Sequence, residues 1–169
     1  PTDHFLRVTI KDLGDHSRSV AHLKRGTRVF VEGPYGAFTA GRATRPHVVM
    51  VGGGVGITPI RALMDEFKNG VQLDVIYRAS KKEDLVLKEE LDYLVANSGG
   101  LTRVHYLVGS RREHPMDAKA LKELVPRISD SDIYICGPGP LVETVKQAAQ
   151  DLGVPKNRFH DEAFAFHSE

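Results

Sequence analysis

The feature of this sequence that most restricts its fold is a glycine-rich run between an apolar segment and a segment of helical periodicity. The run reads Gly52-Gly53-Gly54-Val55-Gly56-Ile57-Thr58-Pro59. Glycine lets the backbone turn sharply and brings its amides close to a ligand. Thr58 is a candidate helix cap and Pro59 suits a first helical turn, so free N–H groups would face an anion. The run predicts a strand, a turn and a helix that bind a pyrophosphate.

This turn differs from two common phosphate-binding loops. It has no lysine of the Walker type, and Ile57 stands where G-x-G-x-x-G requires its last glycine. A tight turn without a ligand is the alternative, but so many glycines carry an entropic cost that a plain turn does not need. We therefore favour the ligand-binding interpretation.

Short apolar runs alternate with helical stretches through the rest of the chain, which is the pattern of βαβ units. Asp117 is a candidate N-cap, and Pro140 can open the last helix. We predict an α/β fold, a Rossmann-like domain over residues 43–169 with a parallel five-stranded sheet. Its strands are expected near residues 47–52, 72–78, 102–108, 132–136 and 157–160.

Residues 1–42 have a different pattern. Apolar and polar side chains alternate over residues 5–10 and again over residues 28–32, as in half-buried antiparallel strands. The polar stretch between them contains turn residues. A few strands do not fold alone, so we predict a small β element that belongs to a larger unit.

Composition excludes several classes of protein. Hydrophobic residues make up 41% and charged residues 27%, and the formal net charge is +1. These are ordinary globular values, and the charge offers no general field for nucleic acid. The apolar runs are far shorter than the roughly 20 residues that span a bilayer. We expect neither nucleic-acid binding nor membrane insertion by this segment.

The metal-binding residue types also carry little signal. The single cysteine, Cys136, permits no internal disulfide, thiolate zinc site or cysteine-held iron–sulfur cluster, which favours a reducing compartment. The eight histidines show no metal-binding spacing. We predict no metal site, and the initial Pro1 suggests a piece of a longer protein.

Two further motifs contain glycine and proline. Cys136-Gly137-Pro138-Gly139-Pro140 follows the fourth predicted strand. Ligands of open α/β sheets lie beyond the carboxyl ends of the strands, so this loop and the glycine-rich run should face one crevice, lined by Cys136. A buried cysteine is more often a small apolar core residue. The other motif, Gly33-Pro34-Tyr35-Gly36, could be a simple hairpin end.

The order G-P-Y-G, G-G-G-V-G-I-T-P, C-G-P-G-P and the terminal E-A-F-A-F resembles the ferredoxin–NADP reductase superfamily, above all the dehydrogenase region of ferric reductases and NADPH oxidases. The resemblance implies the closing strands of a flavin-binding antiparallel β-barrel in residues 1–42, and an NAD(P)H-binding domain in residues 43–169. It implies hydride transfer from NADPH to FAD, then electron transfer to haem or another acceptor. The family's flavin-binding motif Arg-x-Tyr-Ser/Thr is absent, so activity should need the remainder of the FAD-binding domain.

The resemblance also assigns site residues. Residues implied beside the reacting rings are Cys136, Glu162 and Phe166, although Phe166 could instead close the core. Hydride transfer needs the two rings to be oriented and requires no side-chain base. Residues implied to bind cofactor are Gly33, Pro34, Tyr35, Gly36, Gly53, Gly54, Val55, Gly56, Ile57, Thr58, Arg78, Ser110, Arg111, Gly137 and Pro138.

The choice between NADPH and NADH depends on the residues that meet the adenosine ribose. An acidic residue accepts from a 2′-hydroxyl, whereas arginine binds a 2′-phosphate. Arg78 ends the second predicted strand, and Ser110-Arg111 resembles the phosphate-binding pair of NADP-dependent members. We therefore expect NADPH. The arginines could be ordinary surface residues, and Asp84 keeps NADH open as the alternative.

The leading hypothesis is the NADPH-binding part of a membrane-bound flavoprotein, on its cytoplasmic side, with a membrane haem domain in the same polypeptide. A second hypothesis is the soluble reductase component of an oxygenase system. A third is a non-catalytic NAD(P)-sensing module, although a sensor does not need residues that face a flavin.

Overall fold

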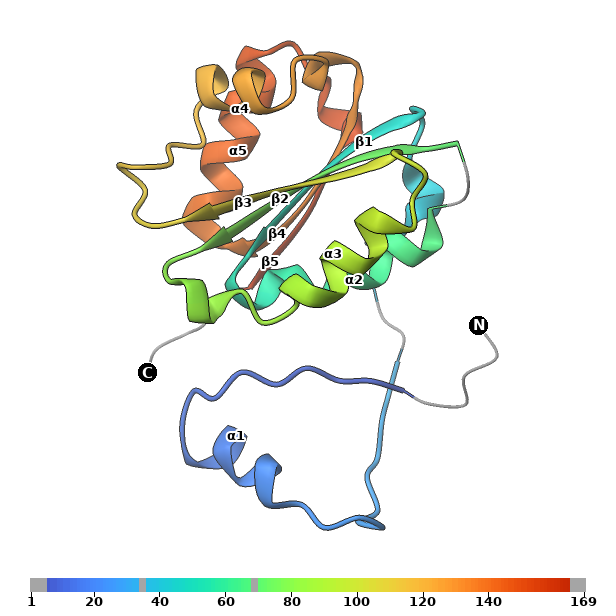
Figure 1. Ribbon diagram of the computed structural model, residues 1–169, viewed down its shortest axis with the longest axis vertical. Helices are drawn as coiled ribbons and strands as arrows, with labels where there is room; N and C mark the ends of the chain where they lie inside the picture. The colour runs from blue at the N-terminus through green and yellow to red at the C-terminus, as the bar shows by residue number, and fades with distance from the viewer. Residues whose placement is uncertain (1–5, 34–35, 68–69, 165–169) are drawn as a thin grey trace. The chain divides into compact units, whose positions relative to one another are not determined.

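The computed structural model describes residues 6–33, 36–67 and 70–164 and divides into two compact units, residues 1–37 and 38–169. The second unit contains one sheet in the order β3-β2-β1-β4-β5, and every neighbouring pair is parallel (Figure 1). This confirms the predicted α/β fold. The strands are β1 (His47–Gly53), β2 (Gln72–Ala79), β3 (Thr102–Val108), β4 (Asp132–Pro138) and β5 (Phe159–Phe164).

Helices cover both faces of the sheet. Helices α2 (Ile57–Glu66) and α3 (Lys88–Ala96) lie on one face, and α4 (Ala118–Leu124) and α5 (Gly139–Asp151) lie on the other (Figure 1). Val48 of β1 is buried in the core on the α2 side, and Val49 in the core on the α5 side. A strand buried on both faces must be apolar throughout, which explains its continuous apolar run.

The helices follow the periodicity of their apolar residues. Ile60, Leu63 and Met64 form the buried face of α2. The side chain of Asp117 accepts a hydrogen bond from the amide of Ala120 at 2.8 Å, so its predicted role as an N-cap is confirmed.

The last strand begins later than predicted. Lys156–Arg158 form a 3-10 turn, η6, which follows Pro155. Strand β5 therefore starts at Phe159 and continues to Phe164. It pairs with β4 along its length.

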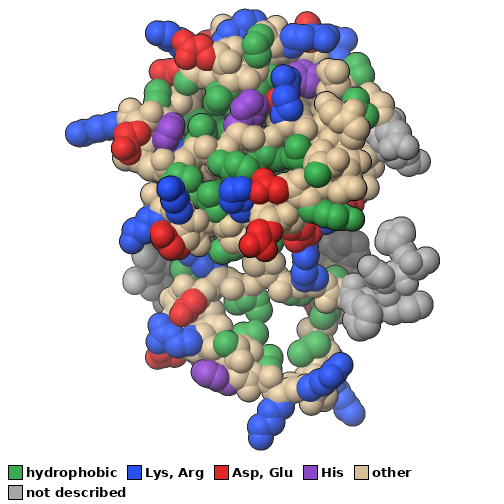
Figure 2. All heavy atoms as spheres, viewed as in Figure 1, with side chains coloured by type: hydrophobic (Ala, Val, Ile, Leu, Met, Phe, Trp, Pro, Cys, Tyr) green, Lys and Arg blue, Asp and Glu red, His purple; other side chains and the backbone are tan. Residues whose placement is uncertain are grey.

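The first unit contains the helix α1 (Asp15–Ser19) and the 3-10 turn η1 (Val20–His22). The strands predicted over residues 5–10 and 28–32 are wrong for the part that the structure describes, because residues 6–10 and 28–32 form no strand. A strand needs a hydrogen-bonded neighbour, and these two segments do not pair. Their apolar side chains are exposed, Leu6 by 72% and Phe30 by 92%, and Figure 2 shows hydrophobic side chains uncovered along this unit.

The second unit starts at Phe38, earlier than the predicted boundary after residue 42. The Phe38 ring packs edge-on against Tyr134, with centroids 5.4 Å apart, and the Tyr134 hydroxyl donates to the carbonyl of Thr39. These contacts hold residues 38–39 against β4. The remaining 3-10 turns are η2 (Ala40–Arg42), η3 (Gly54–Gly56), η4 (Lys82–Asp84) and η5 (Ile128–Asp130).

Among the helices of the described residues, none combines the length and the apolar character that crossing a bilayer requires.

Candidate functional site

Two glycine turns meet where β1 and β4 end. Gly52 is in register with Cys136, and a Cβ at Gly137 would lie 3.3 Å from the backbone of Gly53. A Cβ at Gly56 would overlap the carbonyl of Cys136. The predicted proximity of the two loops is therefore confirmed. Their junction is also the point where the strand order reverses, since the chain goes from β1 to β2 on one side and later to β4 on the other.

The top of the first turn is bare backbone. Gly54 has φ 57°, and no atom lies within 4 Å of the position that its Cβ would occupy. A left-handed backbone favours glycine at this point. The turn thus leaves open space above its peptide groups, as a ligand held by amides requires.

Helices α2 and α5 both start at these turns without side-chain caps. The N-cap of α2 is Gly56 and that of α5 is Pro138. The prediction that Thr58 caps α2 is wrong, because its hydroxyl donates instead to the carbonyl of Val55 at 2.9 Å. No side chain therefore accepts from the first N–H groups of either helix, and both helix dipoles present their positive ends here.

Cys136 and Glu162 lie opposite each other on β4 and β5. Cys136 is fully buried in the core on the α2 side, so it does not line an open crevice as predicted. Burial, reinforced by the charge of Glu162, raises the pKa of the thiol to about 12. At neutral pH Cys136 is therefore an uncharged, apolar group, and Glu162 is the exposed member of the pair.

Phe166, Pro34 and Tyr35 lie outside the described residues, so these predicted site residues have no structural description. Gly33 and Gly36 belong to the first unit and have positive φ angles of 140° and 117°. Glycine suits both conformations.

Arg78 anchors the loop after β3. Its guanidinium donates to the carbonyls of Leu107 at 2.8 Å, Gly109 at 3.3 Å and Ser110 at 3.4 Å. Only 9% of the residue is exposed. These bonds use three of the five guanidinium N–H donors, and they hold the loop in place.

Ser110 is paired with a residue that the sequence reasoning missed. The amide of Ser110 donates to the carboxylate of Glu113 at 2.7 Å, and the amide of Glu113 donates to the Ser110 hydroxyl at 3.3 Å. Hydrogen bonding from Ser110 lowers the pKa of Glu113, which is therefore ionised at neutral pH. The spacing Ser-x-x-Glu is that of a capping box and was the available signal. Arg111 lies exposed between them.

The described residues hold no metal-binding cluster. No group of three or more His, Cys, Asp or Glu is arranged for a metal ion in the described ranges.

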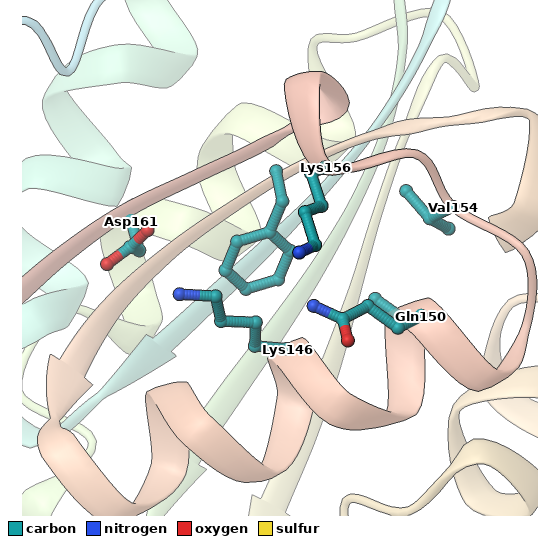
Figure 3. Close-up of a pocket in the computed structure, with 7 residues that line it drawn as sticks. Lys146, Gln150, Val154, Lys156 and Asp161 are labelled. Carbon is teal, nitrogen blue, oxygen red and sulfur yellow. The ribbon is translucent and has the colours of Figure 1, made fainter.

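A hollow of about 200 Å³ lies between α5 and β5 (Figure 3). It is separate from the predicted site, since its lining residues are Lys146, Ala149, Gln150, Val154, Lys156, Phe159 and Asp161.

A family model described as the oxidoreductase NAD-binding domain matches residues 50–147. This range includes the end of β1, both glycine turns and most of α5.

Curated relatives extend the likeness over nearly the whole chain. NADH-cytochrome b5 reductase 1 of Pyricularia oryzae is 34% identical over 170 residues, which cover 90% of this chain and 55% of the relative. The protein of the same name from Aspergillus oryzae is 31% identical over 181 residues, covering 95% and 62%. The chain thus spans little more than half the length of these relatives.

Solved structures share the fold. The cytochrome b5 reductase domain of Ulva prolifera nitrate reductase has a TM-score of 0.71 at 18% identity, over 88% of this chain and 66% of that one. The flavohem-like FAD/NAD binding domain of a Vibrio cholerae nitric oxide dioxygenase has a TM-score of 0.55 at 28% identity, over 82% and 55%. At 18% identity the first likeness bears on the fold alone.

Proposed function

The chain belongs to the oxidoreductase NAD-binding domain family, within the ferredoxin reductase superfamily, and on that premise we propose that it binds NADH where β1 and β4 end and presents it to a flavin. The observation that carries the proposal is the pair of uncapped helix starts beside two touching glycine turns. Such N-termini bind phosphate through N–H groups and the helix dipole.

The residues of the second unit fit a dinucleotide. The bare backbone at Gly54 gives a pyrophosphate room to approach the amides of residues 53–58. Gly137 and Pro138, on the adjacent loop, would border the nicotinamide half. Cys136 beneath them is buried and uncharged at neutral pH. The chain's contribution is to hold and orient the dinucleotide.

The flavin would come from an FAD-binding portion. When bound, FAD supplies the chemistry that accepts a hydride and passes electrons on. The exposed apolar side chains of residues 6–10 and 28–32 are the surface that further barrel strands would cover. Glu162, exposed beside Cys136, and Phe166 remain our candidates for residues at the ring boundary. The residues Gly33, Pro34, Tyr35 and Gly36 remain candidates on the flavin side.

We propose NADH in place of the predicted NADPH. The two fungal relatives are named NADH reductases. In this chain the guanidinium of Arg78 and the amide of Ser110 already have protein partners, the Ser110 hydroxyl accepts from the amide of Glu113, and the Glu113 carboxylate is ionised. This arrangement does not favour a 2′-phosphate.

A haem protein is the electron acceptor that we propose, because the fungal relatives are named for cytochrome b5. More specific predictions rest on the sequence motifs alone. These are a ferric reductase or NADPH oxidase type, a membrane haem domain in the same polypeptide, and a location of this chain on the cytoplasmic side. The oxygenase reductase and the NAD(P) sensor remain the alternatives; rapid flavin reduction by NADH in the complete protein would exclude the sensor.

Two glycines offer a matched test of the binding site. Gly54 and Gly99 have φ angles of 57° and 61°, and neither has an atom within 4 Å of its Cβ position. Gly54→Ala and Gly99→Ala should therefore lose similar stability, about 1 kcal/mol each. Calorimetric titration with NADH should show about tenfold weaker binding for Gly54→Ala only. Equal affinity of the two variants would refute the proposed pyrophosphate site.

A further inference from the structure

The loop after β3 is hydrogen-bonded to the end of β2 and contains the carboxylate of Glu113. The amide of Gly109 donates to the carbonyl of Ala79, which joins the ends of β2 and β3. Gly109 has φ 133°, and a Cβ there would lie 2.8 Å from Oε2 of Glu113. The Glu113 carboxylate thus lies directly against the ends of these two strands.

Arginine side chains lie near that carboxylate. Burial is the main cause that lowers the pKa of Arg78, the charge of Arg111 adds to this shift, and the charge of Glu113 opposes it. The Nε2 of His114 donates to the carbonyl of Val108 at 3.0 Å. Arg111 and Arg112 are exposed in this loop. Without Glu113, the charged side chains of residues 109–114 would all be arginines, which favours a phosphate.

Only one oxygen of Glu113 has a partner among the described residues. Oε2 accepts from the Ser110 amide at 2.7 Å, and no partner is found for Oε1. A carboxylate oxygen at this position can accept from a ribose hydroxyl, and it repels a phosphate monoester. The exposed position of Glu113 makes it accessible to a ligand.

The general geometry of dinucleotide binding brings the ribose to this region. In open α/β sheets the pyrophosphate lies at the turn after the first strand, and the adenosine ribose lies near the end of the next strand. In this chain that strand is β2, and the loop containing Glu113 is joined to its end.

We propose that Glu113 determines the choice of dinucleotide, by accepting a hydrogen bond from the adenosine 2′-hydroxyl of NADH and excluding the 2′-phosphate of NADPH. This inference rests on the proposed function. Arg78 is a positioning residue, because it holds the carbonyls of the loop from beneath. Asp84 is the competing acidic residue: it lies beyond β2 and its carboxylate accepts from the amide of Lys81 at 3.1 Å.

The test compares three charge-neutralising variants of the full chain. Glu113→Gln keeps an oxygen for the Ser110 amide, so the loop should stay folded. Asp84→Asn tests the competing residue, and Glu123→Gln alters an exposed carboxylate on α4 as a neutral control. Dissociation constants are measured calorimetrically for NADH and NADPH, and for 5′-ADP and adenosine 2′,5′-bisphosphate, which report on the adenosine end alone.

We expect Glu113→Gln to shift both affinity ratios toward the 2′-phosphorylated ligand by about tenfold or more, with Glu123→Gln unchanged. Unchanged affinity ratios in Glu113→Gln, or a shift found only in Asp84→Asn, would overturn the role assigned to Glu113. The proposed function would still be supported in that case if the wild-type chain bound NADH. If the wild-type chain bound none of the four ligands, the proposed function would fail, and this inference with it.

Discussion

Gly56 and Cys136 are in backbone contact, because the turn before α2 lies directly on the end of β4. A Cβ at residue 56 would overlap the carbonyl of Cys136 and lie 2.8 Å from the amide nitrogen of Gly137. Both obstacles are backbone atoms, which no change of side-chain rotamer can move. Together with the close approach of Gly53 and Gly137, this contact holds the two glycine turns together and so sets the geometry of the candidate site.

Gly56→Ala should therefore damage stability and binding together. Overpacking of this kind costs about 2 kcal/mol, and relief of the overlap separates the two turns. Urea denaturation measures the loss of stability, and titration with NADH the loss of affinity. Gly41→Ala is the control, since Gly41 has no atom within 4 Å of its Cβ position. A Gly56→Ala variant as stable as Gly41→Ala would contradict this account of the turn.

Asp74 lies near the start of β2, at the end of the sheet away from the glycine turns, and stabilises that end. Its buried carboxylate receives hydrogen bonds from His47 at 2.7 Å, Arg103 at 3.0 Å and His105 at 3.1 Å. Burial alone would raise the pKa of Asp74, but these bonds outweigh burial and hold the pKa well below its ordinary value of 3.8. The stability that Asp74 contributes is thus present above that value and is lost as the pH falls through the lower, folded-state pKa.

Asp74→Asn should lower the free energy of unfolding by about 3 kcal/mol at neutral pH, because it leaves buried His47 without its carboxylate partner. Asp74→Asn should also reduce the loss of unfolding free energy that the wild type shows as the pH falls. Denaturant melts at a series of pH values measure both effects. Asp65→Asn, in an exposed ion pair with Arg61, should cost less than about 1 kcal/mol. Similar losses in the two variants would contradict the role of Asp74.

The sheet and the position of the glycine turns could be predicted from the sequence because their signals are local. Strands β1 and β4 contain short apolar runs, and each glycine turn follows one of them directly. Thr58 misled the prediction, since a hydroxyl near a helix start looks like a cap. Close packing of Gly56 on β4 places the start of α2 two residues earlier, and no local pattern reveals that contact.

The predictions that failed depend on partners distant in the sequence. Residues 6–10 and 28–32 have the alternation of strands, but alternation does not supply a neighbouring strand. The contacts of Arg78 could not be predicted either, because its carbonyl partners lie on β3 and on the loop that follows it. Glu113 was the opposite case: its spacing from Ser110 was visible in the sequence, although its position against the ends of β2 and β3 was not.

His160 should make the second unit sensitive to mild acid. Its side chain is buried, stacks on Tyr134 with centroids 4.4 Å apart, and lies 3.6 Å from Asp132. Neither ring nitrogen has a hydrogen-bond partner in the described part of the chain. Burial lowers the pKa of His160, although Asp132 opposes this shift and Arg42 adds to it. The unfolded chain therefore takes up a proton first, and stability falls as the pH drops below about 6.5.

His160→Phe should keep the ring stacking and remove this proton uptake. The slope of unfolding free energy against pH, measured below about pH 6.5, should decrease by up to about 1.4 kcal/mol per pH unit, the value for one proton. His22→Gln, at an exposed position in the first unit, should leave the slope unchanged. If both variants kept the wild-type slope, His160 would already carry its proton in the folded state, held there by Asp132, and the burial of its ring would not be the dominant influence.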